Sequence, residues 1–202
     1  MAEPIHDIVV VSDLHLGRGK NPRSGRYHRR ETFFYDDDFC QFCQHVCSDA
    51  TERGRKLKLV FNGDAFDFLR IEPEEASPTS TLRERRYGPV MDAPASARVL
   101  HDILRGHPLF LDGIAHVLQA GHDVVFLPGN HDLELQWEAV RAELTDACLA
   151  RIRLGAGDAA AKECAPRLGF APWFYHEAGR VWIEHGCQYD PENAYQFPLR
   201  SL

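Results

Sequence analysis

The chain lacks a long apolar stretch and a secretory leader, the features of membrane and secreted proteins. No apolar stretch approaches the roughly 20 residues that cross a lipid bilayer, and the start, Met1 to Pro4, lacks the basic and apolar regions of a secretory leader. We therefore expect no transmembrane segment and no secretion. An excess of basic residues is also missing, because the net charge is −7. This charge disfavours binding to nucleic acid through a broad basic surface.

Cysteine is too sparse for a disulfide framework. Six cysteines spread over 202 residues do not make the dense pattern of small secreted domains, so we expect a reducing, cytoplasmic environment. Cys40, Cys43 and Cys47 are spaced along one face of a predicted helix. Core packing explains that spacing better than metal binding does.

The composition that remains is ordinary for one globular domain. The chain is 44% hydrophobic and 26% charged, and its length suffices for one core, so we predict a single domain over residues 1–202. Three apolar runs predict buried strands at 8–11, 57–61 and 124–127. Apolar periodicity predicts helices at about 33–53, 95–120 and 133–151, the second broken at His107-Pro108.

Strands that alternate with helices predict a layered α/β fold with ligands at one edge of the sheet. Farther along, residues 173–176 and 180–184 flank Glu177-Ala178-Gly179 and predict a β-hairpin, with His185 directly after it. The alanine-rich residues 156–165 are predicted to form a connecting loop or a helix end. Residues 70–95 are predicted to be an irregular excursion that could act as a lid.

Three polar clusters each follow one of the predicted strands. They are Asp-Leu-His at 13–15, Gly-Asp-Ala-Phe-Asp at 63–67 and Gly-Asn-His-Asp at 129–132. Taken singly, Asp-x-His is more often a turn or a surface pair than a metal site, and Gly-Asp-x-x-Asp could be a helix start capped by its carboxylates. Together they supply the carboxylate, imidazole and amide ligands that suit a pair of borderline divalent cations.

The spacing suggests how the ligands divide between two metals. Asp13 and His15 are two residues apart, so in an extended strand end they point to the same side and would bind one ion. Asp64 is the candidate to bridge, because two ions about 3.5–4 Å apart need a shared carboxylate. Asn130 and His185 would bind the second ion.

Two further residues of the clusters suit proton transfer. His131 would act as a general acid towards the leaving oxygen, since imidazole titrates near neutral pH. Asp67 would orient its ring. Other histidines, which lie within or beside predicted helices, are expected to be surface or packing residues: His45, His101, His116 and His122.

The three clusters resemble the calcineurin-like metallophosphoesterase superfamily over most of residues 5–190. Residues 185–190 and 195–197 are more loosely similar to the UDP-diacylglucosamine pyrophosphatases of lipid A synthesis, which carry arginine at the position of His131. The resemblance implies an α/β-β-α sandwich, two divalent metals, and the ligand and catalytic roles given above. We expect manganese, while iron, zinc, cobalt and nickel also accept oxygen and imidazole ligands.

The family also supplies a Gly-His-x-His segment that these 202 residues do not contain after His185. Two explanations stay open. Either the chain is the front part of a longer protein and lacks its C-terminal strands, which we favour, or the metal site is incomplete. His176 and Asp190 are candidate substitutes for the missing ligands.

Basic residues crowd the segment after the first cluster. Candidates for binding a substrate phosphate there are Arg18, Arg23, Arg26 and Arg29. A solvated loop whose charges touch nothing is the equally weighted alternative. The acidic run Asp36 to Asp38 is predicted to be a solvated helix start.

We therefore expect a hydrolase that cleaves a phosphate ester or pyrophosphate bond through a hydroxide bridging two metals. Its substrate would be a phosphorylated small molecule or a nucleotide-linked compound. The alternative is a catalytically incomplete module of the same fold that binds a metal or ligand. A nuclease is less favoured, and the sequence does not predict the oligomeric state.

Overall fold

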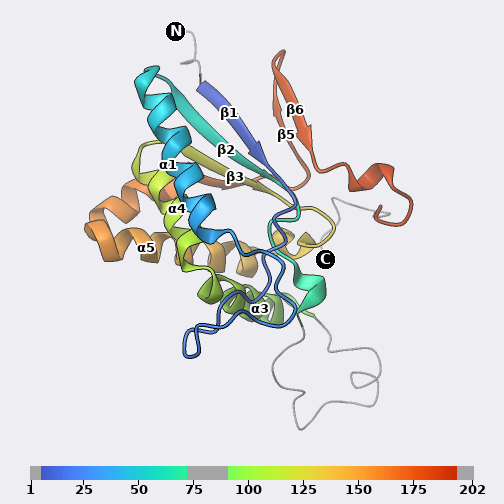
Figure 1. The fold of residues 1–202 in the computed structure, drawn as a ribbon. Helices are drawn as coiled ribbons and strands as arrows, with labels where there is room; N and C mark the ends of the chain where they lie inside the picture. Colours follow the sequence, from blue (N-terminus) through green and yellow to red (C-terminus); the bar gives the residue numbers. More distant parts are fainter. Residues whose placement is uncertain (1–5, 72–90, 195–202) are drawn as a thin grey trace, which may run out of the picture.

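The computed structural model describes residues 6–71 and 91–194 (Figure 1). The predicted excursion therefore lies largely outside the described residues, as do residues 195–197. A four-stranded parallel sheet forms the centre of the fold, in the order β1-β2-β3-β4. Its strands are β1 (His6–Val11), β2 (Lys56–Asn62), β3 (Asp123–Leu127) and β4 (Leu168–Phe170). The three predicted strands are confirmed, whereas β4 was not predicted.

Helices connect these strands in the order predicted for an α/β fold. They are α1 (Asp36–Glu52), α3 (Ala93–Gly106), α4 (Pro108–Gln119) and α5 (Glu138–Cys164). Parallel strands in chain order need crossovers of one hand, which places the helices on one face of the sheet (Figure 1). The predicted break at His107-Pro108 is confirmed, because Pro108 begins α4 where its missing amide hydrogen costs nothing.

One helix prediction needs correction. Residues 133–136 form a 3-10 turn (Leu133–Gln136), and α5 begins only at Glu138. Of the two alternatives for residues 156–165, a loop or a helix end, the structure shows the helix end, which runs to Cys164 after a kink at the non-helical Gly157. Alanine is the strongest helix former, and Ala161 and Cys164 are buried, so local propensity and packing both favour the helix.

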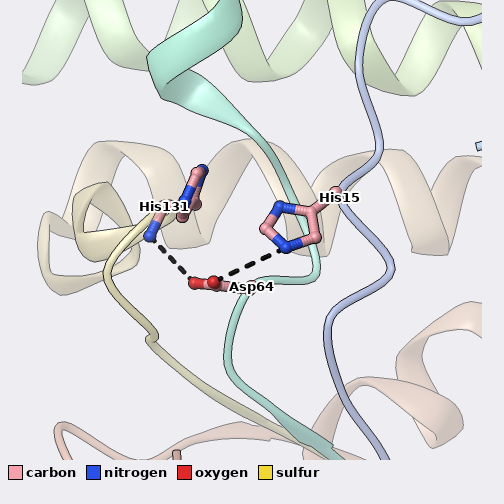
Figure 2. Close-up of side chains that lie close together, drawn as sticks. All are labelled: His15, Asp64 and His131. Atoms are coloured by element: carbon pink, nitrogen blue, oxygen red, sulfur yellow. Dashed lines mark hydrogen bonds and ion pairs between the residues drawn. The ribbon is translucent and has the colours of Figure 1, made fainter. Parts of the chain in front are cut away.

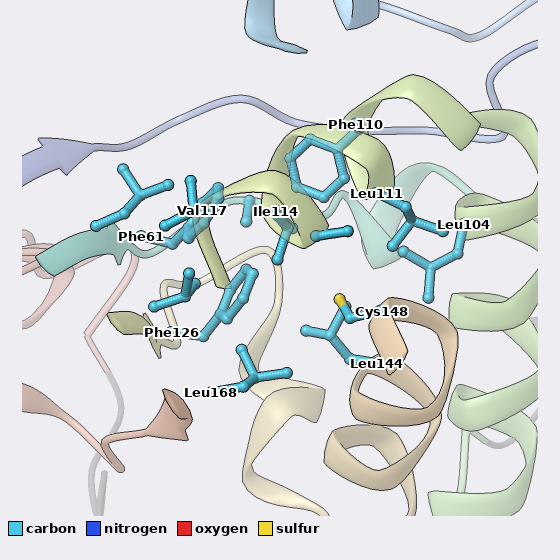
Figure 3. Packing of buried hydrophobic residues seen from close by; sticks show 14 of the residues in the cluster. Phe61, Leu104, Phe110, Leu111, Ile114, Val117, Phe126, Leu144, Cys148 and Leu168 are labelled. Atoms are coloured by element: carbon cyan, nitrogen blue, oxygen red, sulfur yellow. The ribbon is translucent and has the colours of Figure 1, made fainter. Parts of the chain in front are cut away.

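The main core lies between the sheet and the helices. Phe61 of β2 stacks on Phe126 of β3 with ring centroids 4.2 Å apart, and Phe110 of α4 packs edge-on against Phe61 at 5.8 Å (Figure 3). Cys43 and Cys47 are buried in this core, which confirms the prediction of core packing for them, whereas Cys40 is only partly buried and lies outside the core.

A β-hairpin covers part of the opposite face of the sheet. Its strands β5 (Phe174–Glu177) and β6 (Val181–Glu184) are antiparallel, as predicted. Ile183 packs against Val60 and Leu127 of the sheet. The first predicted strand is only half-buried, with Val10 45% exposed, because β1 is an edge strand with one neighbour.

Short 3-10 turns complete the described structure at Phe68–Arg70, Ala165–Arg167 and Cys187–Tyr189. Among the described residues, no helix has both the length and the apolar character to cross a membrane.

Candidate metal centre

The carboxyl ends of β1, β2 and β3 meet at one edge of the sheet, where the three polar clusters lie. The amide of Asp13 donates to the carbonyl of Gly63 at 3.2 Å, and the amide of His15 donates to the carbonyl of Asp64 at 2.9 Å. These bonds continue the pairing of β1 and β2 past the strand ends. Parallel neighbours thereby bring the first two clusters into one site.

Two groups of side chains at this edge could each hold a metal ion. One consists of His15, Asp64 and His131, and the other of Asp13, Asp64 and His185. Within each group the candidate ligand atoms lie within 4.8 Å of one another. Figure 2 shows His15 and His131 on either side of the Asp64 carboxylate. Asp64 is the member that both groups share.

Asp64 is held at the centre by several neighbours. Its Oδ2 lies 3.7 Å from His15 Nε2 and 3.4 Å from His185 Nε2. Its Oδ1 accepts a 2.8 Å hydrogen bond from the His131 backbone amide. The Asp64 carboxylate is buried, and both of its oxygens face candidate ligands or donors. That is the position a bridging carboxylate needs.

The backbone at the ligands differs from the prediction. Asp13, His15 and Asp64 have φ values of 56°, 50° and 52°, so the first two are left-handed rather than extended. Asp13 Oδ1 and His15 Nε2 are nevertheless 3.9 Å apart, and Leu14 packs against the core. Left-handed non-glycine residues are uncommon and cost about 1–3 kcal/mol each. Three of them within one site mark a conformation that the surrounding fold imposes.

Two glycines allow the clusters to approach so closely. A Cβ on Gly129 would lie 2.1 Å from Asp64 Oδ1. One on Gly63 would lie 2.5 Å from the His185 ring, and Gly63 also has a positive φ of 79°. A side chain at either position would push a candidate ligand out of the site.

His185 is oriented by the end of β2. Its Nδ1 lies 2.9 Å from the carbonyl oxygen of Asn62, which leaves Nε2 facing Asp64 and the Oδ1 atom of Asn130 at 3.2 Å. The hydrogen bond to Asp64 raises the pKa of His185 to about 9, against the effect of burial. Burial opposes charge on Asp64, but hydrogen bonds from His185 and the His131 amide outweigh it and lower the Asp64 pKa. A cation bound here would take the place of the His185 proton.

Asp67 contacts His131 as the sequence analysis proposed. Its Oδ1 lies 3.0 Å from His131 Nδ1, and the carboxylate is almost fully buried. Arg70, which the sequence analysis overlooked, places Nε 2.9 Å from the other Asp67 oxygen. The rings of His131 and His15 meet edge to face, with centroids 4.6 Å apart. His131 can therefore serve either as a ligand beside His15 or as a proton donor.

Asp132 is a structural residue of the site to which the sequence analysis gave no role. Its buried carboxylate accepts hydrogen bonds from the amides of Gly129 (2.6 Å), Ala65 (2.8 Å), Asp64 (3.2 Å) and Phe66 (3.3 Å). It therefore joins the loop after β3 to the loop after β2. The tetrapeptide Gly-Asn-His-Asp contained this signal, but only the fold shows which amides it holds.

Other candidate residues lie around or outside this centre. Asn130 also donates to Asn193 Oδ1 at 3.4 Å. His176 packs on Trp182 of the hairpin, and Asp190 bonds to Glu192 and Asn193, so neither joins the two described ligand groups. His45, His101 and His116 are exposed and His122 is buried, which confirms their predicted roles.

The basic loop, residues 17–30, does not direct its arginines to one place. Arg18 and Arg23 line a pocket beside α3, whereas Arg26 and Arg29 are exposed and lie outside its lining. Glu31 anchors the start of the loop by accepting hydrogen bonds from the amides of Gly17 and Gly19.

Three buried charged residues, His107, Glu31 and Asp36, form an ion cluster beside the basic loop. His107 Nδ1 lies 2.9 Å from Asp36 Oδ1, and His107 Nε2 lies 3.4 Å from Glu31 Oε2. The prediction of a solvated helix start is thus wrong for Asp36, which is buried against His107, while Asp37 and Asp38 are exposed. Nothing local in the sequence pairs these three residues, because they come from three segments of the chain.

The cluster links stability to pH. Burial opposes charge on His107, but hydrogen bonds with Asp36 and Glu31 outweigh it and raise the His107 pKa to about 9. Burial likewise opposes charge on Glu31, but hydrogen bonds from His107 and the backbone lower its pKa to about 2. The stabilisation by His107 is complete below about pH 6.5 and is lost as the pH rises through about 9. The stabilisation by Glu31 is complete above about pH 4.5 and is lost as the pH falls through about 2.

We accordingly expect His107 to contribute a fall in the free energy of unfolding of on the order of 3 kcal/mol between about pH 6.5 and about pH 9, since one pKa unit corresponds to about 1.4 kcal/mol. Urea denaturation across this range measures it. His185, whose pKa is also raised to about 9, adds a decline of its own over the same range. His107→Gln should therefore remove about half of the total decline, whereas His116→Gln, at an exposed position of α4, should leave it in place. Equal declines in the wild type and His107→Gln would contradict the assignment.

Comparison with family models, with curated protein sequences and with solved structures finds no match to this chain. Carboxylates and imidazoles are the donors that borderline divalent cations accept. Their convergence on Asp64, in a cradle that a Cβ on Gly129 would fill, fits two such ions.

Proposed function

We propose that the chain is a metal-dependent phosphoesterase of the calcineurin-like kind. One observation carries the proposal: two groups of ligand side chains share the buried carboxylate of Asp64. A shared carboxylate is what two ions about 3.5–4 Å apart require. We also infer that the sheet, its helices and the hairpin belong to the layered sandwich of that superfamily.

In this proposal, Asp13, Asp64 and His185 would hold one ion together with the amide oxygen of Asn130, and Asp64 and His15 would hold the second. This pairing differs from the sequence prediction, in which Asp13 and His15 share one ion. When bound, two manganese or similar ions would acidify water and neutralise the phosphate oxygens of the substrate. The Asn62 carbonyl fixes His185 so that Nε2 faces the site.

His131 supplies the proton for the leaving oxygen. Asp67 lies on Nδ1, which holds the ring in place and leaves Nε2 as the atom that gives up a proton. The substrate we expect is a phosphorylated small molecule or a nucleotide-linked compound.

A hydrolysis assay tests the proposal. The chain is stripped of metal with a chelator, reloaded with manganese, and assayed on p-nitrophenyl phosphate, bis(p-nitrophenyl) phosphate and inorganic pyrophosphate. Turnover of at least one compound that disappears with the chelator is the expected result. Failure to hydrolyse any of the three would overturn the proposal.

The role of His131 has its own signature. His131→Ala should lower kcat by about 10²-fold or more for an ester with a poor leaving group such as phenol, the usual scale for a lost general acid. For p-nitrophenol, which needs little protonation, the loss should be smaller. His116→Ala, at an exposed histidine of α4, is the matched control. Equal losses for both leaving groups would instead assign His131 to metal binding.

A further inference from the structure

A pocket of about 340 Å³ lies between the basic loop and the C-terminal end of α3. Figure 1 shows the loop running beside this helix. The pocket is lined by Arg18, Gly19, Lys20, Asn21, Pro22, Arg23, His28, Asp102, Arg105 and Gly106. It is a different place from the ligand groups around Asp64, with which it shares no residue.

Positive charge dominates the pocket. Among the described residues, the lining includes the cationic residues Arg18, Lys20, Arg23 and Arg105 and one acidic residue, Asp102. Asp102 Oδ2 lies 4.0 Å from Arg18 Nη2, and its Oδ1 lies 3.9 Å from Arg105 Nη1. Even with Arg18 set aside, Lys20, Arg23 and Arg105 leave an excess of positive charge in the described lining. The excess charge suits an anion with several oxygen atoms.

The walls of the pocket are held in place by backbone contacts. The amide of Lys20 donates to the Gly106 carbonyl at 3.1 Å, and the amide of His28 donates to the Gly19 carbonyl at 2.9 Å. The loop and the helix approach so closely that a Cβ on Gly106 would lie 1.9 Å from the Arg18 carbonyl oxygen. The cations are thus presented by a preformed frame, which lowers the entropy that a ligand must overcome.

Helix electrostatics alone do not account for this gathering of charge. A cation in the last turn of a helix stabilises the helix dipole, and Arg105 occupies that place in α3. Arg18, Lys20 and Arg23 belong to the loop, however, and line the same pocket. The helix dipole of α3 does not explain these loop cations.

The pocket is also close to the candidate metal centre. Arg18 follows His15 by three residues, so their Cα atoms are at most about 11 Å apart, given about 3.6 Å per extended residue. We propose that the pocket binds a second phosphate group of the substrate, one that is not hydrolysed. This inference rests on the proposed function, because the ligand is a substrate only if the chain is a phosphoesterase. It narrows the substrate class to small molecules with two separate phosphate groups or a phosphate-bearing extension.

A binding experiment tests the pocket without relying on catalysis. Inorganic pyrophosphate and inorganic phosphate are titrated by calorimetry into protein that carries Asp64→Asn and has been stripped of metal and desalted. Saturable binding of pyrophosphate to one site is expected, and Arg23→Gln with Arg105→Gln should weaken it at least tenfold. Both of these side chains are exposed, so the double variant should fold.

A matched double variant removes the same charge elsewhere. Arg153→Gln with Lys162→Gln alters two exposed residues of α5, away from the pocket, and should change pyrophosphate binding less than twofold. Absence of saturable binding, or equal weakening by the two double variants, would overturn the proposal. Because no turnover is measured, this outcome is independent of whether the chain is a phosphoesterase.

Measurement of KM for two substrates distinguishes a pocket that binds part of the substrate from a separate anion site. In the protein with an intact Asp64, Arg23→Gln with Arg105→Gln should raise KM at least tenfold for a nitrophenyl ester that carries a second phosphate. KM for p-nitrophenyl phosphate, which has only the scissile group, should change less than twofold. Equal changes in both KM values would contradict a role in binding the second phosphate.

Discussion

Asp64→Asn should lower metal-dependent turnover by at least about 10²–10³-fold, the scale of removing one well-placed electrostatic group from an active site. Asparagine keeps the shape of the side chain and an oxygen for the His131 amide at 2.8 Å. It removes the charge that His15 and His185 both face. Both ions should therefore bind more weakly, because the shared ligand serves both.

The measurement is the manganese dependence of kcat for an aryl phosphate ester in the wild type and the variant. Asp146→Asn, at an exposed position of α5, is the matched control and should retain full turnover. Circular dichroism should show that Asp64→Asn remains folded. A folded Asp64→Asn protein with wild-type kcat and unchanged manganese dependence would remove Asp64 from the chemistry.

The second large effect is on stability. Asp132→Ala should lower the free energy of unfolding by about 3–5 kcal/mol, since each buried donor that loses its acceptor costs about 1–3 kcal/mol and rearrangement recovers part. Four backbone amides, from Gly129 and from Asp64 to Phe66, lose a shared acceptor. Urea denaturation of the wild type and the variant measures the difference.

Asp132→Asn separates hydrogen bonding from charge. Asparagine keeps one acceptor oxygen but adds a donor among four amide donors, so its loss of stability should be smaller than that of Asp132→Ala and still clear. Losses below about 1 kcal/mol in both variants would show that the two loops are held together by other contacts, since that is the size of an ordinary hydrogen bond.

Long apolar runs made the central strands and helices predictable. The runs at 57–61 and 124–127 are buried on both sides of the sheet, so their signal is local and strong. Strand β4 has only the three residues Leu168–Phe170, one of them glycine, and it exists through pairing with β3. Such a strand leaves no periodic pattern to detect. A loop and a helix end both stayed open for residues 156–165 because alanine-rich composition and a glycine at 157 gave opposing local signals.

The site was predictable as a set of residues but not as a geometry. The order of the clusters along the chain, and their positions directly after predicted strands, predicted that Asp64, His131 and His185 lie at one edge of the sheet, as the structure shows. The left-handed backbone at Asp13 and His15 has no local signature, because aspartate and histidine adopt it only where the fold requires it. The contacts of Asp132 and the pairing of His107 with Glu31 and Asp36 join residues far apart in the chain, which periodicity cannot reveal.

The number of manganese ions bound per chain tests the central claim most directly. The metal-stripped protein is equilibrated with manganese, desalted, and analysed for metal and protein content. We predict two ions per wild-type chain and fewer in Asp64→Asn, because both ligand groups depend on that carboxylate. One ion or none in the wild type would contradict a two-metal phosphoesterase and favour a module that only binds.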